Sequence, residues 1–239
     1  MDKMVKTKFG SITVANFEPK SWLKNTHLQT ILPKFLLSAP QIQFVNERIM
    51  TPDQDFIDLA WAMPHKQADL TGIVILFHGL EGSSQSHYIK HLVSGLKEIG
   101  LGSVVMHFRG CSGEPNLTPI AYHSGATFDA EFIVPIVKAR YKDVPLFAVG
   151  FSLGGNMLMK LMAHHPSLPL EASVCVSAPL NLAASSSAIQ VGFSRAYQWH
   201  LMKSMKGNLL QKMQMVDMST SLKVSAADIE NMTTFVQFD

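Results

Sequence analysis

The chain has 239 residues, of which 47% are hydrophobic and 16% are charged, and its formal net charge is +2. This length and hydrophobic content suffice for one sizeable core, and a single α/β domain can have this size. The sequence contains no block of like charges, so nothing in it indicates a nucleic-acid partner. Two cysteines, Cys111 and Cys175, are too few for a disulfide scaffold, so we expect a reducing compartment. The sequence also has no cysteine and histidine spacing typical of metal ligands, and we expect neither a metal nor a cofactor.

The N-terminal residues MDKMVKTKFG carry charge, but no apolar segment of the signal-peptide type follows them. The strongest apolar run, GIVILF, is far shorter than the about 20 residues that a membrane span needs. We therefore expect a cytoplasmic protein, with peripheral membrane contact and the oligomeric state left open.

The first 40 residues are expected to be irregular apart from a short helix within 21–36. Two strands, 41–50 and 55–64, are predicted around the turn TPDQ because both are apolar runs bounded by turn residues.

From residue 71 onward strands and helices alternate, and the strands are continuous runs rich in Val, Ile and Leu. Such runs predict a mostly parallel sheet with helices on both faces, in which catalytic residues follow the carboxyl ends of the strands. Pro135 either kinks its helix or belongs to a late first turn. The predicted strands are 71–79, 101–110, 145–151 and 171–179, and the helices are 86–100, 124–141 and 153–165. The loops to inspect begin at His78, Arg109, Ser152 and Ser177.

After residue 180 the alternation stops and the sequence predicts helices. We interpret 1–180 as the core with its irregular N-terminal segment, and 181–239 as a helical lid after the sixth strand. The lid is rich in methionine, which is compatible with an adaptable lipid-facing surface or with plain helix packing. The methionines are Met202, Met205, Met213, Met215 and Met218.

Residues 150–154 match the pattern G-x-S-x-G, with a strand expected before it and a helix after it. A turn of this kind is so tight that the serine takes a strained conformation, and glycines two residues to either side avoid clashes. Ser152 is therefore a candidate nucleophile, with Gly150 and Gly154 as the flanking glycines. The alternative is a glycine-rich bend without chemistry.

A nucleophilic serine also needs backbone N–H groups that stabilise the oxyanion. Leu153 would supply one at the start of the helix, and Leu80 would supply the second from the loop after an earlier strand. His78 lies on the same loop and has two interpretations, a structural residue or the catalytic base.

Five separate segments of the sequence resemble the same protein family. FHGLEGSSQSHYIKHL, VVMHFRGCSGEPN, YHSGATFD, AVGFSLGGNMLMK and the N-terminal NTHLQTILP resemble the YheT-type branch of the α/β-hydrolase superfamily, whose members are carboxylic ester hydrolases by prediction. The resemblance implies an α/β-hydrolase fold, Ser152 as nucleophile, and Leu80 and Leu153 as oxyanion donors. It also implies that the loop 109–116 lies beside the site. Arg109 then either anchors that loop through an ion pair or contacts substrate.

The acid and base of the triad are missing from the expected order, which is serine, then Asp or Glu, then histidine. Downstream of Ser152 the only acid before His200 is Glu171, which opens a strand and so lies at the wrong end of the sheet. His164 and His165 close the helix that leads away from the serine, and His200 lies in the lid. The resemblance implies two further strands that carry the acid and the histidine, so we interpret the chain as stopping before them.

Two functions follow from these observations. The first is hydrolysis of a small-molecule carboxylic ester, with an acyl or lipid ester suggested by the apolar lid, through an acyl-enzyme on Ser152. The second is an inactive hydrolase that at most binds a small acyl ligand. A nucleotide-binding protein is a third class, but the glycine spacings of the phosphate-binding motifs are absent from the sequence.

Overall fold

The structure is a computed structural model that describes residues 3–8, 10–64, 66 and 69–238. The chain divides into two compact units, Met1–Ala39 and Pro40–Asp239. The predicted boundary at residue 180 lies inside the second unit, between its last strand and the helices that follow.

The first unit contains an antiparallel hairpin and a helix. Its helix begins after Asn25, whose side-chain oxygen accepts the N–H groups of His27 and Leu28. The predicted helix is present, but the expectation of an otherwise irregular segment missed the hairpin, since alternation over five residues is a weak signal. The elements are β1 (Lys3–Thr7), β2 (Gly10–Val14), the 3-10 turn η1 (Ser21–Leu23) and α1 (Thr26–Leu36).

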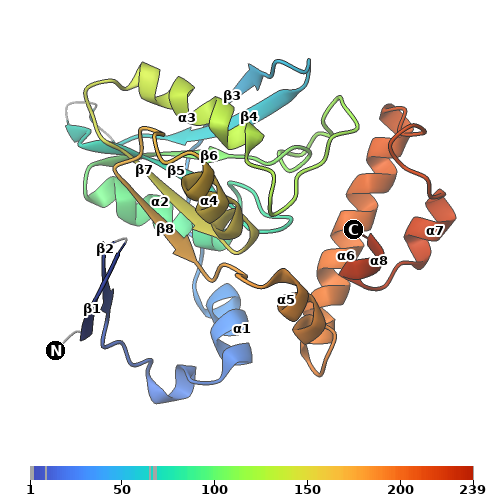
Figure 1. The fold of residues 1–239 in the computed structure, drawn as a ribbon, viewed down its shortest axis with the longest axis horizontal. Coiled ribbons are helices and arrows are strands. Elements are labelled where there is room, and N and C mark those ends of the chain that lie inside the picture. The colour runs from blue at the N-terminus through green and yellow to red at the C-terminus, as the bar shows by residue number, and fades with distance from the viewer. Residues whose placement is uncertain (1–2, 9, 65, 67–68, 239) are drawn as a thin grey trace. The chain divides into compact units, whose positions relative to one another are not determined.

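A six-stranded sheet in the order β3-β4-β6-β5-β7-β8 forms the centre of the second unit (Figure 1). The strands are β3 (Val45–Met50), β4 (Phe56–Ala62), β5 (Gly72–Phe77), β6 (Leu101–Met106), β7 (Leu146–Phe151) and β8 (Ala172–Val176). β5, β6, β7 and β8 run parallel, whereas β4 is antiparallel to both β3 and β6. The predicted mostly parallel sheet is confirmed.

Helices cover both faces of this sheet, as the sequence predicts. They are α2 (His87–Glu98), α3 (Phe128–Arg140) and α4 (Leu153–His164). Buried residues of α3 and α4 pack with Ile73, Ile75 and Phe77 of β5, while those of α2 pack with Val74 and Leu76 on the opposite face. Because β5 is buried on both sides, its sequence is a continuous apolar run rather than an alternating one.

Pro135 is the eighth residue of α3, so the interpretation as a late first turn is wrong. The helix begins at Phe128, four residues later than expected, and continues through the proline. Of the expected range, residues 124 and 125 form a turn, and 126 and 127 lead into the helix with Thr127 as its N-cap.

The chain after β8 is helical, as expected, and comprises α5 (Leu182–Ile189), α6 (Ser194–Met215), α7 (Ala226–Asn231) and α8 (Phe235–Phe238). α7 lies beside α6 (Figure 1), where Lys206 Nζ donates hydrogen bonds to the backbone oxygens of Glu230 and Met232. Met202 and Met218 are buried and Met215 is exposed, so the methionines do not form one exposed surface. Within the described residues, no helix is both long and apolar enough to cross a membrane.

Candidate active site

Ser152 lies at the junction of β7 and α4 and has a backbone φ of 49° and ψ of −117°. A positive φ is uncommon for any residue other than glycine and marks a strained turn. The Ser152 N–H donates to the backbone oxygen of Val176, at 2.8 Å, which ties the turn to the end of β8. Ser152 is thereby held at the carboxyl edge of the parallel strands.

The two flanking glycines occupy places where a side chain would strike backbone. A Cβ on Gly154 would lie 2.5 Å from the backbone oxygen of His78 and 2.6 Å from that of Phe77. A Cβ on Gly150 would meet the backbone of Gly154 at a still closer approach. The tight crossing of α4 over the end of β5 therefore requires glycine on both sides of the serine.

The loop that follows β5 lies beside the serine. A Cβ on Gly79 would be 3.3 Å from the Cβ of Ser152, so the two backbones are in close contact here. Leu80 is the next residue, and Leu153 is the first residue of α4. That their two N–H groups point at one oxyanion position stays a prediction.

His78 is fully buried and uses both ring nitrogens inside the protein. Its Nε2 accepts the N–H of Phe108 at 3.1 Å, which leaves Nδ1 to donate to the backbone oxygen of Gly79 at 2.8 Å. Burial lowers the pKa of His78 to about 3. This geometry favours the structural interpretation, in which a neutral His78 braces the loop after β5 against the end of β6.

A second buried histidine, which the sequence analysis missed, has an equivalent role. His107 Nε2 accepts the N–H of Ser84 at 3.1 Å, and Nδ1 is 3.1 Å from the backbone oxygen of Asp58. Burial lowers its pKa as well. The loop 78–84 is thus attached to β6 by two neutral imidazoles.

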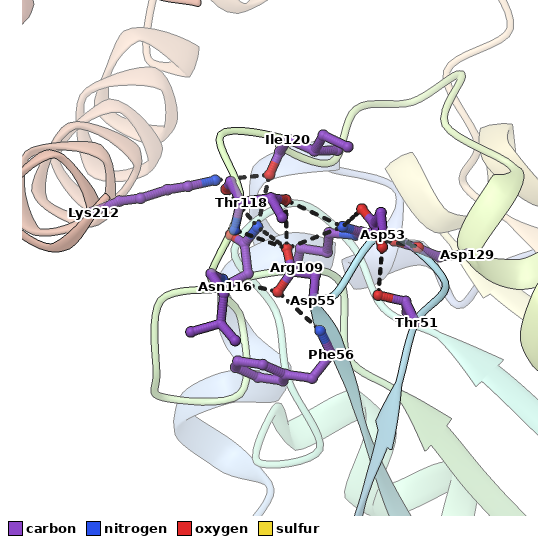
Figure 2. A network of polar contacts seen from close by, with 11 residues as sticks. Thr51, Asp53, Asp55, Phe56, Arg109, Asn116, Thr118, Ile120, Asp129 and Lys212 are labelled. Atoms are coloured by element: carbon purple, nitrogen blue, oxygen red, sulfur yellow. Dashed lines mark hydrogen bonds and ion pairs between the residues drawn. The ribbon is translucent and has the colours of Figure 1, made fainter. Parts of the chain in front are cut away.

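Arg109 lies in a buried network of carboxylates at the end of β6 (Figure 2). Its guanidinium contacts Asp129 at 2.7 Å, Asp53 at 2.6 Å and Asp55 at 3.0 Å, and its side chain is only 3% exposed. Asp55 also accepts from the side chains of Asn116 and Thr118. These ion pairs favour the first of the two alternatives, in which Arg109 anchors its loop, and they bring in three aspartates that the sequence did not single out.

Three of the four residues considered for the triad lie away from the serine, and the fourth is exposed. His164 ends the 12-residue helix α4, about 18 Å along its axis from the serine at 1.5 Å per residue. His165 lies 3.0 Å from Glu131 on α3, and His200 is exposed on α6. Glu171 precedes β8, and its N–H donates to Leu146 at the start of β7, at the opposite edge of the sheet from Ser152.

A cavity of about 170 Å³ begins at Leu80 and Glu81 and extends between the loop 109–122 and α6. Its apolar lining includes Met205, Leu209 and Phe238. Among the described residues, no group of three His, Cys, Asp or Glu side chains is arranged to hold a metal ion.

Polar residues on one face of α6, of which Asn208 and Lys212 line this cavity, also escaped the sequence analysis. Ser204 and Asn208 donate to Glu81, and Lys212 donates to the backbone oxygen of Ile120. Their spacing of four residues, which places them on one face of a helix, is the signal that would have found them.

Comparison with known proteins supports the fold and places the chain in a family. The family model Hydrolase_4, described as Serine aminopeptidase, S33, matches residues 68–234. The chain is 41% identical over 228 residues to "Putative esterase YheT" of Escherichia coli (strain K12), covering 94% of this chain and 66% of that protein. It is 32% identical over 185 residues to Phospholipase ABHD3 of Bos taurus, covering 75% of this chain and 45% of that protein.

The chain thus spans two thirds or less of the length of both relatives. Among solved structures, the α/β serine hydrolase without lid XC6422 from Xanthomonas campestris superimposes with a TM-score of 0.50 at 19% identity. The superposition covers 60% of this chain and 65% of the XC6422 chain. This likeness concerns the fold alone.

The strand–turn–helix at Ser152, the sheet order and the family match lead to one conclusion: the chain belongs to the YheT-like esterase branch of the α/β-hydrolases.

Proposed function

We propose that Ser152 is the nucleophile of a carboxylic ester hydrolase. The observation that carries the proposal is the backbone of Ser152, which takes a φ of 49° between a buried strand and a helix. Backbone strain of this kind is found at active sites, and the strand–turn–helix lifts a nucleophile clear of both elements.

In the proposed reaction, Ser152 Oγ attacks the ester carbonyl and its proton passes to a general base. The carbonyl oxygen becomes an oxyanion, which the N–H groups of Leu80 and Leu153 stabilise. Collapse of the tetrahedral intermediate breaks the ester C–O bond and releases the alcohol, which takes up the proton. Water then attacks the acyl-enzyme, releases the carboxylic acid and restores the serine.

We propose that neither the base nor its acid partner is among the candidates within these 239 residues, because His164, His165 and Glu171 lie away from the serine and His200 is exposed. A serine hydrolase that lacks its base loses on the order of 10⁶ in turnover and keeps roughly 10³ to 10⁴ over the reaction in water. We therefore expect this chain by itself to turn over esters very slowly.

For the substrate, we propose an ester with an apolar acyl group. Met205, Leu209 and Phe238 give the cavity next to Leu80 apolar walls. One relative is named Phospholipase ABHD3, a name that denotes an enzyme acting on phospholipids. Comparison of p-nitrophenyl esters of short and long acyl chains tests this point, since the apolar wall predicts a preference for the longer chain.

The alternative is a binding module that holds an acyl ligand without turnover, and the dispersed triad candidates favour it. Reaction with a fluorophosphonate probe, read by intact mass, separates the two functions. Because the proposed base is not among these residues, we expect one adduct to form slowly on the wild type and on Ser177→Ala through the oxyanion site alone, and none on Ser152→Ala. Ser177 is a matched control because it also has a positive φ, of 51°, after a strand of the same sheet. A label on Ser152→Ala would overturn the nucleophile, and an unlabelled wild type would leave the binding module as the function of this chain.

A further inference from the structure

The side chain of Glu81 connects the helix α6 to the loop that carries Leu80. Ser204 Oγ and Asn208 Nδ2 each donate to Glu81 Oε2, both at 2.6 Å. The two donors are one turn apart on α6 and therefore approach the carboxylate from a single helix face. Lys212, one turn further on, donates to Ile120 at 2.7 Å and makes a second attachment of the same face.

The other oxygen of Glu81 is held by a rigid aromatic residue. The Tyr122 hydroxyl donates to Glu81 Oε1 at 2.8 Å and accepts the N–H of Glu81 at 3.0 Å, so the two residues form a closed ring of hydrogen bonds. The ring of Tyr122 stacks on Phe108 with centroids 5.1 Å apart, and Phe108 in turn makes a T-shaped contact with His78, with centroids 4.8 Å apart. Glu81 is thus fixed from the core and from α6 at once.

Glu81 is also the third residue of the turn that contains Leu80. The N–H of Gly82 donates to the backbone oxygen of Gly79 at 2.9 Å, which closes a four-residue turn with Leu80 and Glu81 at its centre. Glu81 has a φ of 56°, and a positive φ at the third position is typical of a type II turn, where glycine or asparagine is usual. A glutamate adopts this conformation only when its surroundings hold it there.

We propose that Glu81 is a positioning residue through which α6 holds Leu80 in the orientation that the oxyanion requires. The proposal rests on the proposed function of Ser152 and Leu80. With α6 in place, its two donors and Tyr122 keep the turn in its strained form. When α6 moves away, the carboxylate loses two donors, the turn relaxes and the N–H of Leu80 leaves its position. The position of α6 thus controls the oxyanion site.

A simpler role has to be distinguished from this one. If the same bonds only attach α6 to the core, their loss would loosen α6 and leave the turn 79–82 unchanged. If α6 only binds substrate, its loss would weaken binding and leave the maximal rate of the chemical step unchanged. Both can be measured in the 239-residue chain.

The first experiment measures amide hydrogen exchange in the double variant Ser204→Ala/Asn208→Ala. The amides of Glu81 and Gly82 should exchange about tenfold faster or more, since two bonds to a charged group are removed. Gln214→Ala is the matched control, because Gln214 is exposed on the same helix, and it should leave these amides unchanged. Faster exchange confined to α6 in the double variant would overturn the proposal.

The second experiment measures the rate of fluorophosphonate labelling of Ser152 as a function of probe concentration. The double variant should lower the maximal rate about tenfold and leave the half-saturating concentration nearly unchanged. Glu81→Gln, which keeps an acceptor for α6, should retain more of the rate than Glu81→Ala. A changed half-saturating concentration with an unchanged maximal rate would contradict positioning. If the wild type is not labelled, Ser152 is not reactive in this chain, and the exchange experiment alone decides whether α6 controls the turn.

Discussion

Gly154 lies so close to His78 that a Cβ on the glycine would be 2.5 Å from the histidine's backbone oxygen. The start of α4 and the end of β5 are therefore in backbone contact, and this contact brings the loop of Leu80 beside Ser152. The close approach of the Ser152 turn to its proposed oxyanion loop therefore requires a residue without a side chain at position 154.

Gly154→Ala should consequently destabilise the protein by about 2 kcal/mol or more, because the backbone atoms that a Cβ meets cannot move aside cheaply. Gly95→Ala is the control, since Gly95 lies in α2 and a Cβ there has nothing within 4 Å. It should stabilise by about 0.5–1 kcal/mol through helix propensity. Urea unfolding measures both, and equal effects of the two substitutions would contradict the close approach.

Arg109→Met should cost about 3–5 kcal/mol of unfolding free energy. The substitution leaves the carboxylates of Asp55 and Asp129 buried without their cation. The comparison is Arg140→Met, which breaks an ion pair with Glu47 whose side chains are 40% and 31% exposed, and should cost about 1 kcal/mol or less. A small loss for Arg109→Met would show that the network does not anchor the loop.

His78 should remain neutral well below the pH at which a free histidine gains its proton. Burial lowers its pKa from 6.5 to about 3, so the unfolded chain binds a proton between these values and the native chain does not. The contribution of His78 to the free energy of unfolding therefore decreases as pH falls from 6.5 toward 3. Ring-nitrogen chemical shifts should show Nδ1 protonated at neutral pH and unchanged down to about pH 4.5. A His78 ring that titrates near neutral pH would instead make it a candidate for the base.

Lys212 should give a dependence of the same sign at alkaline pH. Burial lowers its pKa from 10.5 to about 8, a shift that Asp55 opposes and Arg109 reinforces. Between pH 8 and 10.5 the unfolded chain keeps a proton that the native chain has lost, so stability from this group rises with pH. Below pH 8 the lysine is protonated in both the native and the unfolded chain. The native state then bears the full free-energy cost of burying the charge.

The variant Lys212→Met lacks this contribution. The unfolding free energy of the wild type minus that of the variant should increase by up to about 3 kcal/mol from about pH 7 to about pH 10.5. A difference that stays constant over this range would mean that the ammonium group is in contact with solvent.

Much of the fold was predictable because its signals are local. The run GIVILF is apolar at every position, which reports a strand buried on both faces, and the G-x-S-x-G of residues 150–154 marks the strand–turn–helix that the structure contains. The element boundaries were less accurate, as for α3, whose start at Phe128 was expected four residues earlier.

The sequence by itself determined the order of strands and helices, the mostly parallel sheet and the place of Ser152 in it, because periodicity and glycine spacing act over a few neighbouring residues. Only the tertiary structure decided what surrounds the serine. Arg109 meets Asp53 across 56 positions of the chain, and Glu81 meets Ser204 across 123. Contacts of this kind depend on how the loops at the carboxyl edge of the sheet converge, and no local pattern in the sequence encodes that convergence.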